Sequence, residues 1–353
     1  MLLEDQRYMQ RAFDLAALGK GSVAPNPIVG ALLVYKGRII GEGYHRAYGK
    51  AHAEVNAVES VKPEDRKYIP YSTLYVSLEP CNIHRNTPPC TLLILQERIP
   101  KVVISCLDHT PGVDGSGVQR LRDAGVEVVV GVLEEQGRRL SNIRNTFVQQ
   151  HRPYVILKWA QAADGQFAPQ TQQQFWLTNA FSKRLVHKWR SEVDGVLVGY
   201  QTALTDNPQL NNRLYYGPQP KRVVIDRKGS LPTDLNLFDG SLPTIVVTNK
   251  QMSPKFASAN IKVLSVLQTG SDWPIQALKG LAKLGISALI VEGGEKTLSA
   301  FIKSGCWDEA RVFQAATFMG RGRPAPLLPV VPYQSYRLGD DQLFWYLNSL
   351  NLH

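Results

Sequence analysis

The chain has few cysteines and no long apolar run. Its 353 residues include only four cysteines, too few for a disulfide framework, which favours a reducing compartment. The N-terminus has neither the basic region nor the apolar stretch of a signal peptide, and no apolar segment approaches the length needed to cross a bilayer. Internal repeats and low-complexity segments are also lacking. We therefore expect a cytoplasmic protein that does not have a membrane as a partner.

Acidic residues are in the minority. The formal net charge is +10, from 40 Lys+Arg and 30 Asp+Glu. The excess is concentrated in one half, because residues 1–150 carry a net +2 and residues 151–353 a net +8. A basic half attracts phosphate, whether on a cofactor, a sugar phosphate or a nucleic acid. Charge alone does not choose among these.

The most informative pattern is a set of metal-binding residue types in His52-Ala53-Glu54, Glu79-Pro80-Cys81 and Pro88-Pro89-Cys90. One imidazole and two thiolates are three protein ligands for a tetrahedral zinc, with the fourth corner left for water, whereas a closed structural site needs a fourth ligand. Glu54 is too close to His52 to be that ligand but is well placed to move protons. The pattern is typical of hydrolytic zinc deaminases, in which water attacks a ring carbon and a glutamate carries protons to departing ammonia. It therefore predicts a catalytic metal.

Apolar periodicity predicts strands that alternate with helices in the first 146 residues. Residues 29–34 have the length and branching of a buried strand, and a turn at 35–38 leads into 39–43 as a hairpin. This alternation predicts an α/β/α layered domain. The other expected strands are 73–77, 102–106 and 126–130, and the expected helices are 4–20, 52–60, 90–98 and 118–124.

A polar segment that ends in Pro153 separates this domain from a second one. We expect a first domain at 1–147, a linker at 148–153 and a second domain at 154–353. The second half again alternates helices with strands, which indicates another α/β domain. Its expected strands include 154–159, 195–199, 222–225, 244–248 and 288–292.

Eight residues separate Cys81 from Cys90, and they end in Thr87-Pro88-Pro89. Deaminases that act on cytidine or on bases within nucleic acid usually have a much shorter gap. With this loop the chain resembles the bifunctional deaminase/reductase family of riboflavin biosynthesis, over essentially its whole length. The resemblance implies a cytidine-deaminase-like α/β/α domain followed by a dihydrofolate-reductase-like α/β domain. It also rests on Pro25-Asn26-Pro27 with Val29-Gly30, on Gly41-Glu42-Gly43-Tyr44-His45, and on Thr110-Pro111 to Gly115-Ser116-Gly117.

In the first domain, the resemblance implies that His52, Cys81 and Cys90 bind Zn²⁺ and that Glu54 is the proton shuttle. The substrate would be the diaminopyrimidinone of a ribosylamino 5′-phosphate, which loses its 2-amino group as ammonia. Asn26 and His45 are candidates for substrate binding, since an amide can pair with the edge of a flat heterocycle. A structural role is the alternative for Asn26, because asparagine is a common turn residue.

The loop between the two cysteines departs from the family pattern, which is Ser-His-x-Gly-basic ahead of Thr-Pro-Pro-Cys. Here the loop begins Asn82-Ile83-His84-Arg85-Asn86, so that Ile83 occupies the usual histidine position. The zinc ligands are unaffected. We hypothesise that Arg85 supplies the positive charge that faces the substrate phosphate.

The second domain carries motifs of the same family. The segment from Lys158 to Gly165 resembles the opening of the reductase domain, and Val291-Glu292-Gly293-Gly294 resembles its glycine-rich turn. Glycines after an apolar strand let backbone amides approach a diphosphate, and a helix N-terminus favours negative charge. The implied cofactor is NADPH, which would deliver hydride to the anomeric carbon of the ribosylamino group.

Carried over by position, the resemblance assigns two sets of residues in this domain. Arg190 and Arg213 suit a 5′-phosphate, because guanidinium groups match phosphate oxygens. The substrate is expected at Lys158, Gln174, Arg190, Leu210, Arg213 and Glu292. The nicotinamide cofactor is expected at Ala160, Trp176, Thr202, Asp206, Arg227, Gly294, Glu295, Lys296, Thr297, Leu298, Ser299 and Ala300.

Two other interpretations stay open. A zinc deaminase of nucleic-acid bases, with the basic second half as a binding module, would need a short inter-cysteine gap and basic-aromatic clusters, and neither stands out. An enzyme with one active half is supported only by Ile83 and by Ala162-Ala163 in place of the family's Ser-Leu. As partners we expect a phosphorylated pyrimidine and no nucleic acid, with a homo-oligomer as one option beside a monomer.

Overall fold

The structure is a computed structural model, and it describes residues 2–84, 88–110, 112–170, 176–249, 260–266 and 272–348. The chain divides into two compact units, Met1–His151 and Arg152–His353, and each is described by itself. None of the helices in these described ranges combines the length and the apolar character needed to cross a bilayer.

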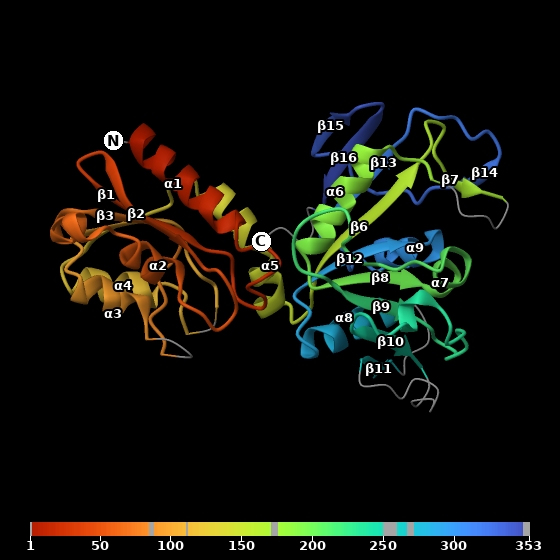
Figure 1. The fold of residues 1–353 in the computed structure, drawn as a ribbon, viewed down its shortest axis with the longest axis horizontal. Coiled ribbons are helices and arrows are strands. Elements are labelled where there is room, and N and C mark those ends of the chain that lie inside the picture. Colours follow the sequence, from red (N-terminus) through yellow and green to blue (C-terminus); the bar gives the residue numbers. More distant parts are fainter. Residues whose placement is uncertain are drawn as a thin grey trace. The chain divides into compact units, whose positions relative to one another are not determined.

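The first unit is built on a five-stranded sheet with the strand order β2-β1-β3-β4-β5 (Figure 1). The strand β1 is antiparallel to β2 and β3, whereas β3, β4 and β5 are parallel. The strands are β1 Gly30–Tyr35, β2 Arg38–Tyr44, β3 Thr73–Leu78, β4 Lys101–Cys106 and β5 Glu127–Val130. The helices are α1 Leu2–Ala17, α2 Ala53–Glu59, α3 Cys90–Gln96, α4 Ser116–Asp123 and α5 Glu134–Gln149, with a 3₁₀ helix at Pro63–Tyr71.

Strand alternation sorts the apolar residues of this sheet onto two faces. Ala31 and Leu33 pack in one core with residues of α2, α3 and α4. Leu32 and Val34 pack in the other core with residues of α1, against which Leu140 of α5 also lies. The unit is therefore an α/β/α sandwich, as predicted, and α2 and α3 lie on the same face (Figure 1).

The helix α2 approaches the sheet unusually closely. A Cβ added to Gly43 would lie 2.3 Å from the backbone nitrogen of Ala57, so glycine is required where the strand β2 meets the helix. This contact fixes the height of α2 above the sheet, and with it the position of the residue that precedes the helix, His52.

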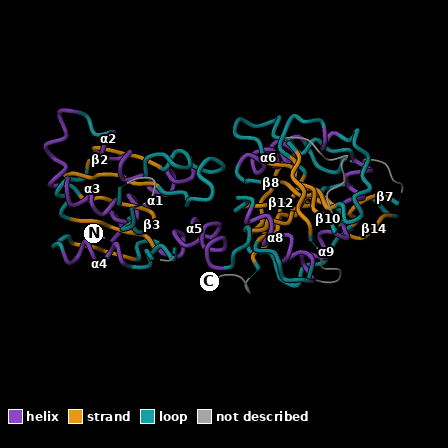
Figure 2. Tube along the Cα trace, turned by 90° about the horizontal axis from the view of Figure 1, so that it is seen from below, coloured by secondary structure: helices purple, strands orange, loops and turns teal. Residues whose placement is uncertain are grey.

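The second unit is built on a nine-stranded sheet with the order β11-β10-β9-β8-β12-β6-β13-β16-β15. The strands from β11 to β13 are parallel, and β16 and β15 are added as antiparallel strands at one edge. In Figure 2 its strands form the centre and its helices lie outside. The sheet strands are β6 Tyr154–Gln161, β8 Gly195–Gly199, β9 Lys221–Ile225, β10 Thr244–Thr248, β11 Ile261–Ser265, β12 Ala288–Gly293, β13 Glu309–Gln314, β15 Gln334–Leu338 and β16 Asp341–Leu347.

Helices cover both faces of this sheet. Val155, Leu157 and Trp159 of β6 face a core that includes residues of α8 and α9. On the opposite face Trp189 of α6 stacks on Phe313 of β13. The helices are α6 Ala180–Ser191, α7 Tyr200–Asp206, α8 Trp273–Lys283 and α9 Glu295–Lys303, with a 3₁₀ helix at Asn236–Phe238 and a two-stranded sheet of β7 Gln166–Pro169 and β14 Gly322–Pro324.

The sequence predicted the strands of the first unit to within one residue at each end. It did not predict α5, β7, β14 or the hairpin of β15 and β16. The helix α5 ends at Gln149, so two residues of the expected linker at 148–153 are helical.

Candidate functional site

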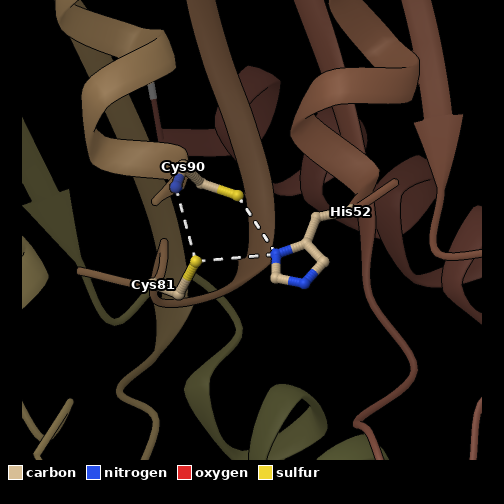
Figure 3. Close-up of side chains that lie close together, drawn as sticks. All are labelled: His52, Cys81 and Cys90. Atoms are coloured by element: carbon tan, nitrogen blue, oxygen red, sulfur yellow. Dashed lines mark hydrogen bonds between the residues drawn. The ribbon is translucent and has the colours of Figure 1, made fainter. Parts of the chain in front are cut away.

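His52, Cys81 and Cys90 meet at one point of the first unit (Figure 3). Their potential ligand atoms all lie within 4.8 Å of one another. The Nδ1 atom of His52 is 3.2 Å from the Cys90 sulfur and 3.5 Å from the Cys81 sulfur, and the Cys90 N–H donates to the Cys81 sulfur at 3.3 Å. The three residues come from separate elements: His52 precedes α2, Cys81 follows β3, and Cys90 begins α3.

The chemistry of these donors suits a divalent cation. Hydrogen bonding to Cys90 and His52 lowers the pKa of the Cys81 thiol to about 4 despite its burial. The neighbouring Cys81 thiolate, together with burial, raises the pKa of Cys90. Two thiolates this close repel each other, and a bound metal ion removes that repulsion because it deprotonates the thiols that coordinate it. An imidazole and two thiolates form a zinc-type ligand set with one coordination position left open.

Glu54 lies beside these ligands in the first turn of α2 and is only 4% exposed. Burial raises the pKa of its carboxyl, opposed by the charge of His52. A carboxyl whose pKa is raised toward neutrality can both accept and donate a proton at working pH.

Asn26 and His45 extend the site from the metal ligands. The His45 ring packs edge-on to His52, with 5.4 Å between ring centroids. Its Nδ1 donates to the Ala51 carbonyl at 3.0 Å, which leaves Nε2 to accept from the Asn26 amide at 3.1 Å. Burial lowers the pKa of His45, so the ring is a neutral acceptor. The structure therefore brings both predicted residues next to the metal ligands.

Sequence reasoning missed the role of Glu79, which is 3% exposed. Its carboxylate accepts four backbone N–H groups of the loop that leads into α4. The Oε1 atom accepts from Gly117 and Val118 at 2.9 and 3.3 Å, and Oε2 accepts from Asp108 and Gly115 at 3.2 and 2.9 Å. Glu79 is two residues from Cys81, so this bonding fixes the loop against a metal ligand. The available signal was a glutamate directly before Pro-Cys.

Arg144 was also missed. From α5 it donates to the Pro25 carbonyl at 3.0 Å and to the Thr110 hydroxyl at 3.2 and 3.3 Å. It thus ties the turn that carries Asn26 to the loop that Glu79 holds. No local pattern could show this, because Arg144 and Pro25 are 119 residues apart.

The departing loop is described only in part, because Arg85, Asn86 and Thr87 lie outside the described residues. The Asn82 carbonyl oxygen accepts from the Thr91 hydroxyl at 3.1 Å and from Arg120 at 2.8 Å. Asn82 therefore fastens the start of this loop to α3 and α4.

A second cluster of charged side chains lies in the second unit. Leu157 of β6 pairs with Val291 of β12, so Lys158 and Glu292 are neighbours on the face that α6 covers. Arg190 of α6 donates to both Glu292 oxygens at 2.7 and 2.9 Å. Burial alone would raise the pKa of Glu292, but Arg190 and Lys158 lower it to about 2. Burial lowers the pKa of Lys158.

The other predicted substrate residues are placed differently. Leu210 is buried, with a left-handed φ of 48°, and Arg213 is exposed, with its guanidinium 2.9 Å from the Asn211 side-chain oxygen. Gln174 lies outside the described residues.

The predicted cofactor residues gather at the carboxyl ends of the parallel strands. Gly294 precedes α9, and its N–H donates to the Thr202 hydroxyl of α7 at 2.9 Å. A Cβ on Gly294 would lie 2.9 Å from that hydroxyl oxygen. Ala160 is near the end of β6 and Arg227 follows β9, exposed. This edge of a parallel sheet is where nucleotides usually bind.

The remaining cofactor candidates differ in what they offer. Asp206 ends α7, and burial raises its pKa. Trp176 is 58% exposed, and the Lys183 amine lies 4.0 Å from its ring centroid. The side chain of Leu298 packs in the core, which leaves its backbone for a cofactor. On the first turns of α9, Lys296 is exposed, whereas Glu295, Thr297, Ser299 and Ala300 are half-buried.

Both halves match known families. Residues 3–106 match the cytidine and deoxycytidylate deaminase zinc-binding region, and residues 153–340 match the RibD C-terminal domain. The riboflavin biosynthesis protein RibD of Aquifex aeolicus is 41% identical over 90% of this chain and 88% of that protein. The RibD of Bacillus amyloliquefaciens is 37% identical over 92% of this chain and 87% of that protein.

Solved structures agree over the whole chain. A diaminohydroxyphosphoribosylaminopyrimidine deaminase/5-amino-6-(5-phosphoribosylamino)uracil reductase from Thermotoga maritima is 36% identical, with a TM-score of 0.88 and 98% of each chain covered. Acinetobacter baumannii RibD is 30% identical, with a TM-score of 0.88, and the match covers 98% of this chain and 99% of that one.

These matches confirm the predicted fold class, a cytidine-deaminase-like domain followed by a reductase domain, and the predicted cofactors, zinc and NADPH. The chain belongs to the RibD family of bifunctional deaminase/reductase enzymes of riboflavin biosynthesis.

Proposed function

We propose that the first unit deaminates 2,5-diamino-6-(5-phosphoribosylamino)pyrimidin-4-one and that the second reduces the ribosyl group of the product to ribityl phosphate. The proposed deaminase domain is 1–147 and the reductase domain 154–353, joined by 148–153. The observation that carries the proposal is the convergence of His52, Cys81 and Cys90 within 4.8 Å, with the buried Glu54 beside them.

In the deaminase, His52, Cys81 and Cys90 hold the metal. Zinc, when bound, supplies a Lewis acid that makes water a nucleophile near neutral pH. Glu54 takes a proton at its carboxylate and passes it to the departing amino nitrogen. Because His45 holds the Asn26 amide nitrogen, the Asn26 oxygen is left to accept from an N–H on the pyrimidine edge.

In the reductase, NADPH supplies the hydride. Gly294 and the following residues of α9 face the cofactor diphosphate with backbone N–H groups, while Ala160, Trp176, Thr202 and Asp206 complete its site. Arg227 is proposed to contact the 2′-phosphate. On the substrate side, Lys158 and Glu292 bracket the sugar and Gln174 and Leu210 line the pocket. Arg213 offers an exposed guanidinium to the 5′-phosphate, and Arg190 adds charge from its pair with Glu292.

The test of the deaminase uses Glu54→Gln. Ammonia release should fall by about 10²–10⁴-fold, the usual contribution of a general acid–base, with zinc content unchanged and with the reductase still active on the deaminated intermediate. The matched control is Glu59→Gln, an exposed glutamate of the same helix. Full ammonia release from Glu54→Gln would exclude the proposed proton path.

The order of the two reactions is tested with the wild-type protein. The diaminopyrimidinone substrate should release ammonia without NADPH, and NADPH should be oxidised only after deamination. Oxidation of NADPH without ammonia release would contradict this order. Failure of either reaction would instead favour an enzyme with one active half.

Arg85 is proposed to face the substrate phosphate in the deaminase. Its replacement by alanine should raise the KM of deamination, because a phosphate contact is lost, and should leave kcat nearly unchanged. An unchanged KM would rule out this role.

We also propose a cytoplasmic enzyme without a nucleic-acid partner. The two thiol ligands support a reducing compartment, since they bind metal only in the reduced form. Addition of tRNA or single-stranded DNA should not inhibit deamination of the small substrate. We further propose a homo-oligomer, and sedimentation of the purified protein would show whether it exceeds the mass of one chain.

A further inference from the structure

The segment Asn211–Arg213 of the second unit lies outside the helices and strands of the described chain. Its backbone polar groups are satisfied by side chains instead. Arg190 donates to the Asn211 carbonyl at 2.9 Å. The Arg213 N–H donates to Nδ1 of His187 at 3.2 Å. Three consecutive residues are thus held from α6 at both ends.

Gln219 holds the middle residue of the segment. The Asn212 N–H donates to its Oε1 atom at 2.7 Å, and its Nε2 atom donates to the Asn212 carbonyl at 2.7 Å. A primary amide can make both bonds at once, as a neighbouring strand would with its own N–H and C=O. Asn212 is only 4% exposed, so loss of this partner would leave buried backbone groups unsatisfied.

His187 acts from the other side of the segment. It precedes Arg190 by three residues on α6, so both side chains project from one face of the helix. Nδ1 can accept from the Arg213 N–H only while the ring is neutral with its proton on Nε2. The adjacent Leu210 has a left-handed φ of 48°, a backbone state that costs free energy unless its surroundings impose it.

The segment ends in the exposed side chain of Arg213. With its backbone held by His187 and its guanidinium 2.9 Å from the Asn211 oxygen, Arg213 is presented in a defined direction. We propose that His187 and Gln219 are positioning residues of the reductase, which hold the backbone of Asn211–Arg213 so that Arg213 meets the substrate phosphate. This inference rests on the proposed phosphate role of Arg213.

The first test uses Gln219→Met, which has similar length but makes no amide pair. The KM of the phosphorylated reductase substrate should rise about tenfold, which corresponds to loss of one hydrogen bond of about 1.4 kcal/mol, while kcat changes little. Calorimetry should show the same weakening for ribose 5-phosphate. The control is Gln276→Met, an exposed glutamine of α8, and deamination by each variant reports that the first unit is intact.

The second test separates His187 from a purely structural role. In His187→Asn the side-chain oxygen can take the place of Nδ1 as an acceptor, whereas His187→Leu has none. Leucine should raise KM and asparagine should restore most of the affinity. All six tryptophans belong to the second unit, so tryptophan fluorescence shows whether each variant is folded there.

Arg213→Ala distinguishes the two possible failures. If Arg213→Ala raises KM but Gln219→Met and His187→Leu do not, the positioning role is wrong and the phosphate role stands. If Arg213→Ala leaves KM unchanged, the proposed phosphate role is wrong. Equal loss of affinity in His187→Leu and His187→Asn would also overturn the acceptor argument.

Discussion

The guanidinium of Arg190 and the carboxylate of Glu292 form a two-point ion pair, with N–O distances of 2.7 and 2.9 Å and side chains only 11% and 8% exposed. The pair joins α6 to β12 in the middle of the second sheet. Lys158 lies on the neighbouring strand and contributes a second positive charge. Two cations therefore share one anion, and the pocket favours a ligand that carries negative charge.

Removal of the carboxylate should uncouple this pair. In Glu292→Gln, Arg190 and Lys158 lose their counter-ion while buried, and we expect a loss of about 3–5 kcal/mol in unfolding free energy together with loss of reductase activity. Urea unfolding followed by tryptophan fluorescence measures the effect in the second unit. The control Glu192→Gln removes a surface pair of the same helix with Lys188 and should cost under about 1 kcal/mol.

The same pair predicts a direction with pH. Because the pKa of Glu292 is lowered to about 2 in the fold, its stabilisation is present above the ordinary glutamate pKa and is lost as pH falls toward 2. The stability difference between wild type and Glu292→Gln should therefore shrink below about pH 4. A difference that stays constant from pH 7 to pH 3 would contradict the assignment.

Sequence patterns predicted the sheet of the first unit because its apolar residues alternate. Ala31 and Leu33 face one core and Leu32 and Val34 the other, so the strand and its two covered faces follow from side-chain type alone. The metal ligands were predictable for a different reason: few residue types bind zinc, and only histidine and cysteine in this spacing make an open site.

The supporting residues were not predictable, because their roles depend on partners distant in sequence. Nothing in the order of residues shows that the Glu79 carboxylate receives four loop N–H groups, or that Arg144 reaches Pro25. The family resemblance singled out Arg190 and Glu292, but their pairing follows from the register of β6 and β12. Periodicity reports which residues are buried and not which polar groups meet.

Glu79 provides a prediction for the deaminase. In Glu79→Gln one oxygen can still accept two N–H groups, but the new NH₂ faces two N–H donors, which are left unsatisfied. We expect a cost of about 1–3 kcal/mol for each buried donor left unpaired and weaker zinc binding, because the loop against Cys81 loosens. Competition with a chelator measures the zinc affinity. Unchanged affinity, with Glu97→Gln as the exposed control, would show that this loop does not support the metal site.

His187 predicts a pH dependence of stability in the second unit. Burial and the charges of Arg190 and Arg213 lower its pKa to about 4, with Glu292 acting in the opposite direction. The unfolded chain therefore binds a proton below about pH 6.5 that the folded protein does not bind until about pH 4, so stability falls as pH decreases across this window. Each pKa unit corresponds to about 1.4 kcal/mol. In His187→Asn the unfolding midpoint, followed by tryptophan fluorescence, should change less between pH 7 and pH 5, and an identical slope would refute the shift.

Arg227 predicts the choice between the two nicotinamide cofactors. It is exposed directly after β9, at the edge where the carboxyl ends of the parallel strands meet. A guanidinium there can bind the 2′-phosphate of NADPH, and a hydrogen bond to a charged group contributes about 1.5–3 kcal/mol. Arg227→Ala should thus raise the KM for NADPH roughly 10- to 100-fold and leave that for NADH nearly unchanged, with the neighbouring exposed Lys228→Ala as control. Equal loss with both cofactors would mean that Arg227 acts on the common part of the dinucleotide and does not read the phosphate.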